Sequence, residues 1–221
     1  LTRVLREHGT MNGLITESPL NADLELIKAY KCNDPVSLVS TKKMYVEGNG
    51  KYKIALLDFG MKENICRCLT KRDCTVYVFP SSTSVEELLS VNPDGIFLSN
   101  GPGDPSDNVD IIENVKKLIM LKKPMMGICL GHQLLALAHG FSTTKLKYGH
   151  RGANQPVKHL ESGRTYISSQ NHGYAVVNES IDENVAKPLF INVNDNTNEG
   201  LLYINEPCFS VQFHPEACAG P

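Results

Sequence analysis

The stretch "KKPMMGICLGHQLLALAHG", residues 122–140, joins a short apolar run to a helical pattern through Gly127, Cys129 and Gly131. The run "PMMGI" suits a buried strand, whereas "HQLLALA" has the apolar spacing of a helix. The two glycines allow a sharp turn from strand to helix, where neighbouring side chains would not fit. This unit predicts an α/β fold with a cysteine at the turn.

The same alternation extends upstream of this turn. Apolar runs alternate with helical patterns from residue 54: "IALLD" then "MKENICRCLTKR", "TVYVFP" then "SVEELLS", "GIFLS" then "VDIIENVKKLIML". This rhythm predicts a parallel sheet with helices on both faces. Beyond residue 140 the strand-like segments lie close together: "QPVKHL", "TYISSQ", "YAVVN", "LFINVN", "GLLYI" and "CFSVQF". We therefore expect a mixed, largely parallel, flavodoxin-like open sheet with antiparallel additions in its C-terminal half.

Residues 1–53 differ in character from the rest. A loop-and-strand stretch "EHGTMNGLI" precedes a helical "PLNADLELIKAY", and residues 32–53 are polar with Gly and Pro punctuation. We expect residues 1–31 to be the tail of a preceding domain, 32–53 a linker and 54–221 the α/β domain. The chain begins with Leu1 rather than methionine, so we expect it to be a piece of a longer protein.

Composition excludes several classes of function. The 22 basic and 24 acidic residues nearly cancel and form no basic stripe, so nucleic acid is not expected as a partner. The seven cysteines form no Cys-x-x-Cys pair, which argues against a disulfide framework or zinc site and favours reduced thiols in the cytoplasm. No apolar run approaches the roughly 20 residues that cross a bilayer, and the amino end lacks the apolar core of a signal peptide.

Cys129 is the candidate nucleophile. Gly127-Ile128-Cys129-Leu130-Gly131 has the spacing of the G-x-S-x-G nucleophile elbow, with sulfur in place of oxygen. The start of a helix favours a thiolate, and we expect this position to lower the thiol pKa from about 8.5 into the range of roughly 3.5 to 7.5. The alternative is a small core cysteine beside a tight turn, but the two glycines favour the nucleophile.

His214 is the candidate base. In "CFSVQFHPEA", Phe209, Val211 and Phe213 alternate on one face of a strand, and His214, Pro215 and Glu216 follow. Catalytic groups in an open parallel sheet gather beyond the carboxyl ends of the strands. If this strand runs parallel to the Cys129 strand nearby, His214 reaches the thiol and Glu216 orients the imidazole. The alternative is a strand-ending turn with surface charges.

Five of the other six histidines have simpler interpretations. We expect His132 to turn away from the thiol and His139 to end the helix, whereas His8 lies outside the domain. His150 and His159 lie in polar, turn-rich surroundings.

Backbone donors for an oxyanion follow another strand. In "GIFLSNGPGDPSD" the glycines let backbone N–H groups approach a ligand, and Pro102 has no N–H. The candidate donors are the amides of Gly101 and of Leu130, the residue after the nucleophile. Nucleophile, base and donors together indicate attack on a carbonyl.

Four segments in this order, "SNGPGDP", "GICLGHQ", "SQNHGYAV" and "QFHPEA", resemble the signatures of the triad glutamine amidotransferases across residues 54–221. Those enzymes hydrolyse the side-chain amide of glutamine through a cysteinyl thioester and pass ammonia to a synthase. Further stretches, "LREHGTMNGLI", "ALLDFGMKENICRCL", "YGHRGANQPV" and "NDNTNEG", resemble the small-subunit or fused glutaminase region of the carbamoyl phosphate synthetases. Residues 1–31 resemble the end of the extra domain that precedes the amidotransferase domain there.

The resemblance implies a role for each matching residue. Cys129 is the nucleophile, His214 the base and Glu216 its orienting carboxylate, with Gly101 and Leu130 as oxyanion donors. The groups that hold the α-amino and α-carboxylate groups of glutamine are Gly103, Gln133, Asn171, Gly173 and Tyr174. His172 has a structural role. No cofactor or metal is expected in this chain; ATP, Mg²⁺ and bicarbonate belong to the synthetase partner, a large subunit or a fused domain.

Three alternatives stay open. The chain could serve another glutamine-dependent synthase, of the GMP, CTP or anthranilate type, for which residues 1–31 would be unnecessary. A free-standing cysteine hydrolase or peptidase would accept amides that lack the glutamine zwitterion, and "SQNHGY" argues against it. A non-catalytic docking module is disfavoured by an intact triad.

Overall fold

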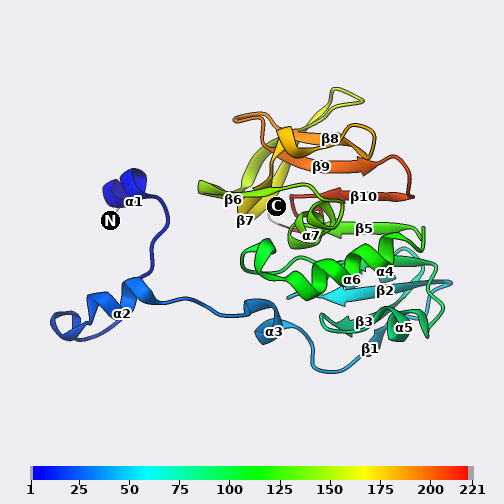
Figure 1. Ribbon diagram of the computed structural model, residues 1–221, viewed down its shortest axis with the longest axis horizontal. Coiled ribbons are helices and arrows are strands. Elements are labelled where there is room, and N and C mark those ends of the chain that lie inside the picture. Colours follow the sequence, from blue (N-terminus) through cyan, green and yellow to red (C-terminus); the bar gives the residue numbers. More distant parts are fainter. Residues whose placement is uncertain (1, 219–221) are drawn as a thin grey trace.

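The computed structural model describes residues 2–218; the outer ends of the expected units, residue 1 and residues 219–221, lie outside the described residues. In the described part, ten strands form one sheet in the order β1-β3-β2-β4-β5-β10-β9-β8-β6-β7 (Figure 1). Its centre is a run of parallel strands: β3 (Cys74–Pro80), β2 (Tyr52–Asp58), β4 (Gly95–Leu98), β5 (Met125–Ile128) and β10 (Cys208–Val211). The prediction of a mixed, largely parallel sheet is confirmed.

The direction of winding reverses at β2. The next strand in the chain, β3, pairs with one side of β2, and β4 pairs with the other side, which is the flavodoxin-like order. In such a sheet, ligands bind beyond the carboxyl ends of the strands at the reversal. The loops after β2, β4 and β5 meet at this edge.

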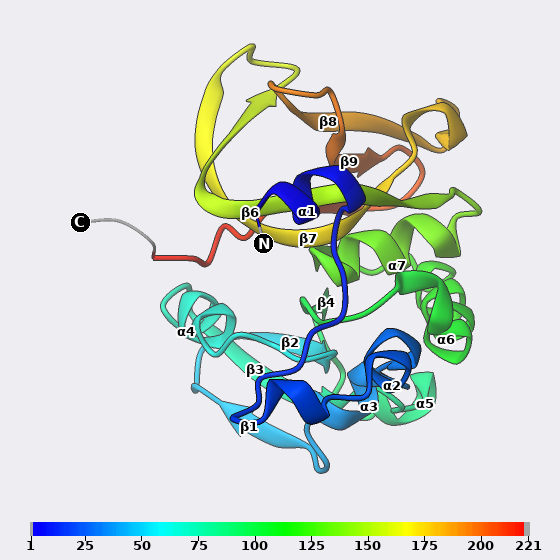
Figure 2. The ribbon, with the colours of Figure 1, turned by 90° about the vertical axis from the view of Figure 1, so that its left-hand side faces the viewer.

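Helices cover both faces of the parallel strands. Four helices connect them: α4 (Asn64–Thr70), α5 (Val85–Leu89), α6 (Val109–Ile119) and α7 (Leu130–Ala138). Successive residues of β2 point to opposite faces, so Leu57 packs with α5–α7 and Leu56 packs with α4 (Figure 2). Short 3₁₀ turns, η2 (Pro105–Asp107) and η3 (Asn178–Ser180), complete the connections. No helix within residues 2–218 is both long and apolar enough to cross a membrane.

The C-terminal half adds antiparallel strands. They are β6 (Thr143–His159), β7 (Thr165–Val176), β8 (Ala186–Asn192) and β9 (Asn198–Tyr203). The segment "CFSVQF" departs from the expected pattern, because β10 inserts between β5 and β9 and runs parallel to β5. The short connections between these segments favour antiparallel pairing of consecutive strands. Strand β10 does pair antiparallel with β9, but its other edge pairs parallel with β5 at the centre of the sheet. It is the fifth parallel strand.

The amino-terminal segment extends away from the sheet (Figure 1). It contains α1 (Thr2–His8), η1 (Pro19–Asn21) and α2 (Leu24–Ala29), and neither α1 nor α2 has a buried residue. The Asp23 carboxylate caps α2 by accepting from the amides of Glu25 and Leu26. The stretch "EHGTMNGLI" contains no strand in the described residues, because its backbone has no neighbouring strand to pair with.

The expected linker, residues 32–53, carries secondary structure that packs on the sheet. Helix α3 (Pro35–Val39) buries Val36 in the core, and β1 (Tyr45–Glu47) pairs antiparallel with β3 at the sheet edge. The segment reads as polar because an edge strand and a surface helix bury few side chains. Its Thr41 amide donates to Asp58 Oδ2 at 2.7 Å, which ties it to the functional edge of β2.

Candidate active site

Cys129 forms a strained turn between β5 and α7. Its φ of 53° and ψ of −104° form a combination that few residues other than glycine adopt. A Cβ at Gly127 would lie 2.7 Å from the Gly131 carbonyl, and one at Gly131 would lie 2.2 Å from Leu98 O. The requirement for both glycines is therefore confirmed by the close approach of the backbones.

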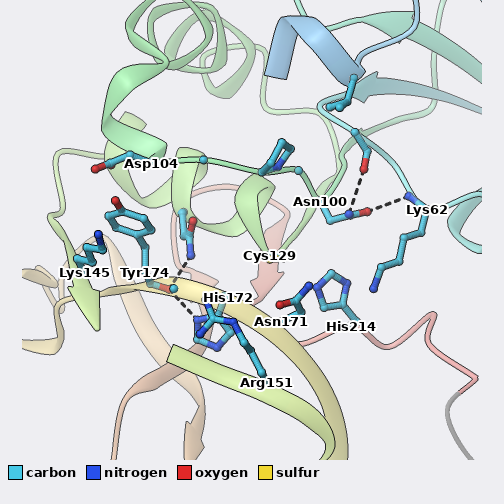
Figure 3. A pocket seen from close by; sticks show the side chains of 17 residues that line it. Lys62, Asn100, Asp104, Cys129, Lys145, Arg151, Asn171, His172, Tyr174 and His214 are labelled. Carbon is cyan, nitrogen blue, oxygen red and sulfur yellow. Dashed lines mark hydrogen bonds between the residues drawn. The ribbon is translucent and has the colours of Figure 1, made fainter. Parts of the chain in front are cut away.

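His214 leaves the sheet at the same edge. Val211 pairs with Ile128 in the parallel β10–β5 ladder, and the Cys129 amide donates to Val211 O at 2.9 Å. Strand β10 ends at Val211, three residues before His214, whose amide donates to Ser169 O of β7 at 2.9 Å. Cys129 and His214 consequently line one cavity (Figure 3).

Glu216 lies behind His214. The distance between His214 Nδ1 and Glu216 Oε1 is 2.7 Å, and both side chains are 3% exposed. Because a carboxylate only accepts, Nδ1 carries the proton and Nε2 of the neutral ring has a free lone pair. That lone pair is what a general base for a thiol requires.

Lys62 joins this group from the loop after β2, and sequence reasoning missed it. Its Nζ lies 3.9 Å from Glu216 Oε1, while its amide donates to Asn100 Oδ1 at 3.1 Å. Asn64 Nδ2 also donates to the Glu216 carbonyl. The available signal was the position of "GMKEN" directly after β2, at the edge where the sheet collects functional groups.

The Cys129 thiol is held protonated by its surroundings. Burial raises its pKa to about 12, against the opposing effect of a hydrogen bond from the Leu130 amide. The expected lowering by the helix start is wrong, because loss of water costs the thiolate more than one N–H donor returns. A thiolate must therefore form by proton transfer within the site.

The two expected oxyanion donors lie next to one another. A Cβ on Gly101 would lie 2.2 Å from Phe59 O and 2.7 Å from Leu130 Cδ2, so this loop packs directly against the elbow. Asn100 holds the loop in place through its Nδ2, which donates to Gly60 O at 3.1 Å. Gly101 lines the cavity, and the Leu130 N–H reaches the Cys129 sulfur.

The cavity has a volume of about 630 Å³. The five expected substrate-binding residues all line it: Gly103, Gln133, Asn171, Gly173 and Tyr174. Gln133 Nε2 donates to Tyr174 O and to Gln212 Oε1, both at 2.8 Å, which leaves its own oxygen as an acceptor. Leu130 and Glu216 do not line the cavity and lie behind its wall.

Charged side chains complete the wall, and the sequence did not identify them. Lys145 lies opposite Tyr174 and Arg151 opposite Asn171 in the β6–β7 pair, so both cations reach the cavity from β6. Asp104 adds an anion (Figure 3). Burial, and a hydrogen bond with Asp104, raise the pKa of Tyr174 to about 12. Charges of both signs suit a zwitterionic ligand.

The remaining histidines do not compete for the role of base. His132 is fully buried with Nδ1 2.8 Å from Ser210 Oγ, and burial lowers its pKa to about 3. His139 ends α7, where its Nδ1 donates to Leu135 O at 2.9 Å. His150 lies within β6, where a long hairpin replaces the turns suggested by "YGHRGANQP". His159 is the last residue of β6 and borders a turn, as expected, with its Nδ1 2.8 Å from Ser162 Oγ.

Comparison with known proteins identifies relatives for this arrangement. Residues 55–221 match the family model described as glutamine amidotransferase class-I. The carbamoyl phosphate synthase small chain of Clostridium perfringens is 51% identical, over all of this chain and 63% of its own length. That of Caldanaerobacter subterraneus is 51% identical over all of this chain and 60% of its length. The chain thus spans about three fifths of the length of these curated relatives.

Solved structures share the fold. A putative GMP synthase protein from Thermoplasma acidophilum superposes with a TM-score of 0.66 at 23% identity, covering 78% of this chain and 87% of that one. A glutamine amidotransferase from Thermotoga maritima superposes with a TM-score of 0.60 at 17% identity, covering 75% of this chain and 76% of that one.

Proposed function

Since the chain belongs to the class-I glutamine amidotransferase family, we propose that it is the glutaminase region of a glutamine-hydrolysing carbamoyl phosphate synthetase. The observation that carries this proposal is the convergence of Cys129 and the hydrogen-bonded pair His214–Glu216 on one cavity. The five expected substrate-binding residues line that same cavity.

The reaction proceeds through a thioester. His214 Nε2 takes the proton from Cys129, and the thiolate attacks the amide carbon of glutamine. The amides of Gly101 and Leu130 stabilise the oxyanion, and the loss of one such donor typically costs about 2.7–4 kcal/mol. The protonated His214 gives its proton to the leaving nitrogen, so ammonia departs as the C–N bond breaks. His214 then activates water, which releases glutamate and restores the thiol.

Ammonia needs a path that glutamine does not occupy. A second cavity of about 510 Å³ shares His214 with the first, and Ser169, Phe190 and Phe213 also line it. Ammonia released at His214 can leave through it towards a synthetase partner, a large subunit or fused domain. ATP, Mg²⁺ and bicarbonate would react there.

The amino-terminal residues favour this synthetase over other glutamine-dependent enzymes. The carbamoyl phosphate synthase small chains align with all of this chain, whereas the class-I family model begins at residue 55. We assign residues 1–31 to the tail of a preceding domain and residues 54–221 to the amidotransferase domain. All seven cysteines are free thiols, which suits a cytoplasmic enzyme.

The nucleophile is tested by labelling with a diazo-ketone analogue of glutamine, followed by peptide mapping. We expect one adduct, on Cys129, that excess glutamine suppresses and that Cys129→Ala abolishes. Cys68→Ala is the matched control and should leave labelling unchanged. Labelling spread over several cysteines, or none, would overturn the assignment.

The partner is tested by co-purification with the full-length protein. We expect a synthetase that consumes ATP and bicarbonate. Capture of a GMP, CTP or anthranilate synthase instead would favour the corresponding rival function. Hydrolysis of amides that lack the α-amino and α-carboxylate groups would favour a general amidase.

A further inference from the structure

A charged cluster, buried except for the half-exposed Asp195, lies beside the part of β7 that lines the cavity. It consists of His150 on β6, Glu199 on β9 and Asp195 in the turn before β9. None of the three lines the cavity, and Glu199 is completely buried. The mechanism above uses none of them, yet a buried carboxylate and imidazole in contact are costly unless they are paired.

Both nitrogens of His150 face carboxylates. Nε2 lies 2.7 Å from Asp195 Oδ2, and Nδ1 lies 3.2 Å from Glu199 Oε1. Burial raises the pKa of Glu199, and the contact with His150 opposes that effect. When both carboxylates are ionised they accept and do not donate, so the ring carries a proton on each nitrogen and is an imidazolium. Hydrogen bonds to the two carboxylates raise the pKa of His150 to about 9, against the effect of its burial. His150 thereby supplies the positive charge that Glu199 requires.

The cluster contacts the glutamine-binding segment through His172. The rings of His150 and His172 meet edge to face with centroids 4.8 Å apart, and His172 Nε2 lies 4.0 Å from Glu199 Oε1. Burial, together with the positive charges of His150 and Arg151, lowers the pKa of His172 to about 4, so this ring stays neutral.

His172 in turn fixes a carbonyl of the cavity wall. Its Nδ1 donates to Tyr174 O at 2.7 Å, and the same oxygen accepts from Gln133 Nε2. The cluster is therefore joined through one ring to residues 171, 173 and 174, which line the cavity.

We propose that the His150–Glu199 ion pair is a positioning element that sets glutamine affinity by fixing residues 171–174 through the neutral ring of His172. Neither residue touches the substrate. The inference rests on the proposed glutaminase function, and it predicts that loss of the imidazolium loosens ground-state binding while the Cys129–His214 chemistry stays intact. The effect should appear in KM rather than kcat.

A bound metal is the competing interpretation of the cluster. Three residues, His150, His172 and Glu199, each offer one possible ligand atom, and these three atoms lie within 4.8 Å of one another. A metal there would need the lone pair of His150 Nδ1, but that nitrogen lies against a carboxylate that needs its proton. A proton therefore accounts for the arrangement, and chelation distinguishes the two cases.

The test is the pH dependence of glutaminase kinetics in the full-length protein. In the wild type, KM for glutamine should stay constant across neutral pH and rise as His150 deprotonates near pH 9. In Glu199→Gln the imidazolium loses one of its two carboxylates, so KM should rise at lower pH and be about fivefold or more higher near pH 8.5. The value of kcat should stay within about twofold. Glu161→Gln, an exposed change in the β6–β7 turn, is the matched control.

A second variant covers the possibility that Glu199→Gln fails to fold. The double change His150→Gln with Glu199→Gln removes both charges, and it should keep a raised KM that lacks the step due to His150 and retains only the pH dependence of the glutamine α-amino group. An unchanged KM profile in either variant, a fall in kcat alone, or a wild-type KM that chelator raises would overturn the inference. A wild type that hydrolyses no glutamine would overturn the proposed function instead.

Discussion

The amide of Cys129 donates to the carbonyl of Val211, at 2.9 Å, and this bond joins the nucleophile elbow to the strand that precedes the base. The β5–β10 ladder thus aligns the two catalytic segments by backbone pairing rather than by loop contacts. Rigid strands hold functional groups more precisely than loops do. The proposed catalysis therefore depends on strand pairing as well as on the chemistry of the side chains.

Replacing the nucleophile should separate activity from stability. Cys129→Ala should abolish ammonia release from glutamine, and Cys129→Gly should be about 1 kcal/mol more stable than Cys129→Ala, because glycine relieves the positive φ. Glutaminase assays and urea unfolding of both variants measure the two effects. Equal stability of the glycine and alanine variants would contradict strain at the elbow.

A methyl group at the elbow should destabilise the fold. In Gly131→Ala the new Cβ would meet Leu98 O at 2.2 Å, and we expect the free energy of unfolding to fall by about 1–3 kcal/mol or more. Gly13→Ala is the control, because no atom lies within 4 Å of that Cβ. Comparable losses in the two variants would refute the packing argument.

The orienting carboxylate should matter more than its lysine neighbour. Glu216→Gln removes the negative charge that orients His214 and stabilises its protonated form, so kcat should fall about a hundredfold or more with the fold intact. Lys62→Met breaks a longer contact of 3.9 Å and should have a smaller effect. Steady-state ammonia release measures both, and a reversed order would assign the orienting role to Lys62.

The reactivity of Cys129 should show its protonation state. Burial raises the thiol pKa to about 12, so alkylation by iodoacetamide without glutamine should still accelerate above pH 9. In denaturant the alkylation rate of the same cysteine should level off once the pH exceeds the ordinary thiol pKa of about 8.5. Peptide mapping of timed samples gives both rates. A folded-state plateau near neutral pH would indicate a preformed thiolate.

The charge on His150 should make stability depend on pH. Its folded pKa is raised to about 9 from an ordinary value near 6.5, so the stabilisation is complete below about pH 6.5 and is lost as pH rises through 9. The melting temperature of the wild type should therefore fall as pH rises through this window. The double change His150→Gln with Glu199→Gln should remove that slope below about pH 8.5, the ordinary pKa of the buried thiols, and a slope that persists there would point to other groups.

Local features of the fold could be predicted from the sequence. The elbow was accessible because Gly127 and Gly131 lie in one strand–turn–helix unit, although the contact that requires Gly131 is with Leu98 of the neighbouring strand β4. The secondary structure within residues 32–53 was not predicted, because β1 has only three residues, Tyr45–Glu47, and all three are exposed at the sheet edge. Here polarity reflects position at an edge rather than absence of structure.

Properties that depend on distant pairing could not be predicted. The contribution of Lys145 and Arg151 to the cavity follows from the β6–β7 register, which includes irregularities that spacing does not disclose. The pKa of Cys129 was misjudged because helix position is local, whereas burial is created by segments that pack over the sulfur. The insertion of β10 beside β5 likewise depends on pairing between segments that are distant in the sequence.

That insertion also bears on how the molecule is made. Strand β10 is the last of the sheet in chain order but lies between β5 and β9. Until it is synthesised and docks, β5 and β9 present open edges that could pair with other chains. Contacts between residues so distant in sequence form slowly. In the proposed mechanism, the step that closes these edges also brings His214 to Cys129, so we expect catalytic competence to appear only when folding is complete.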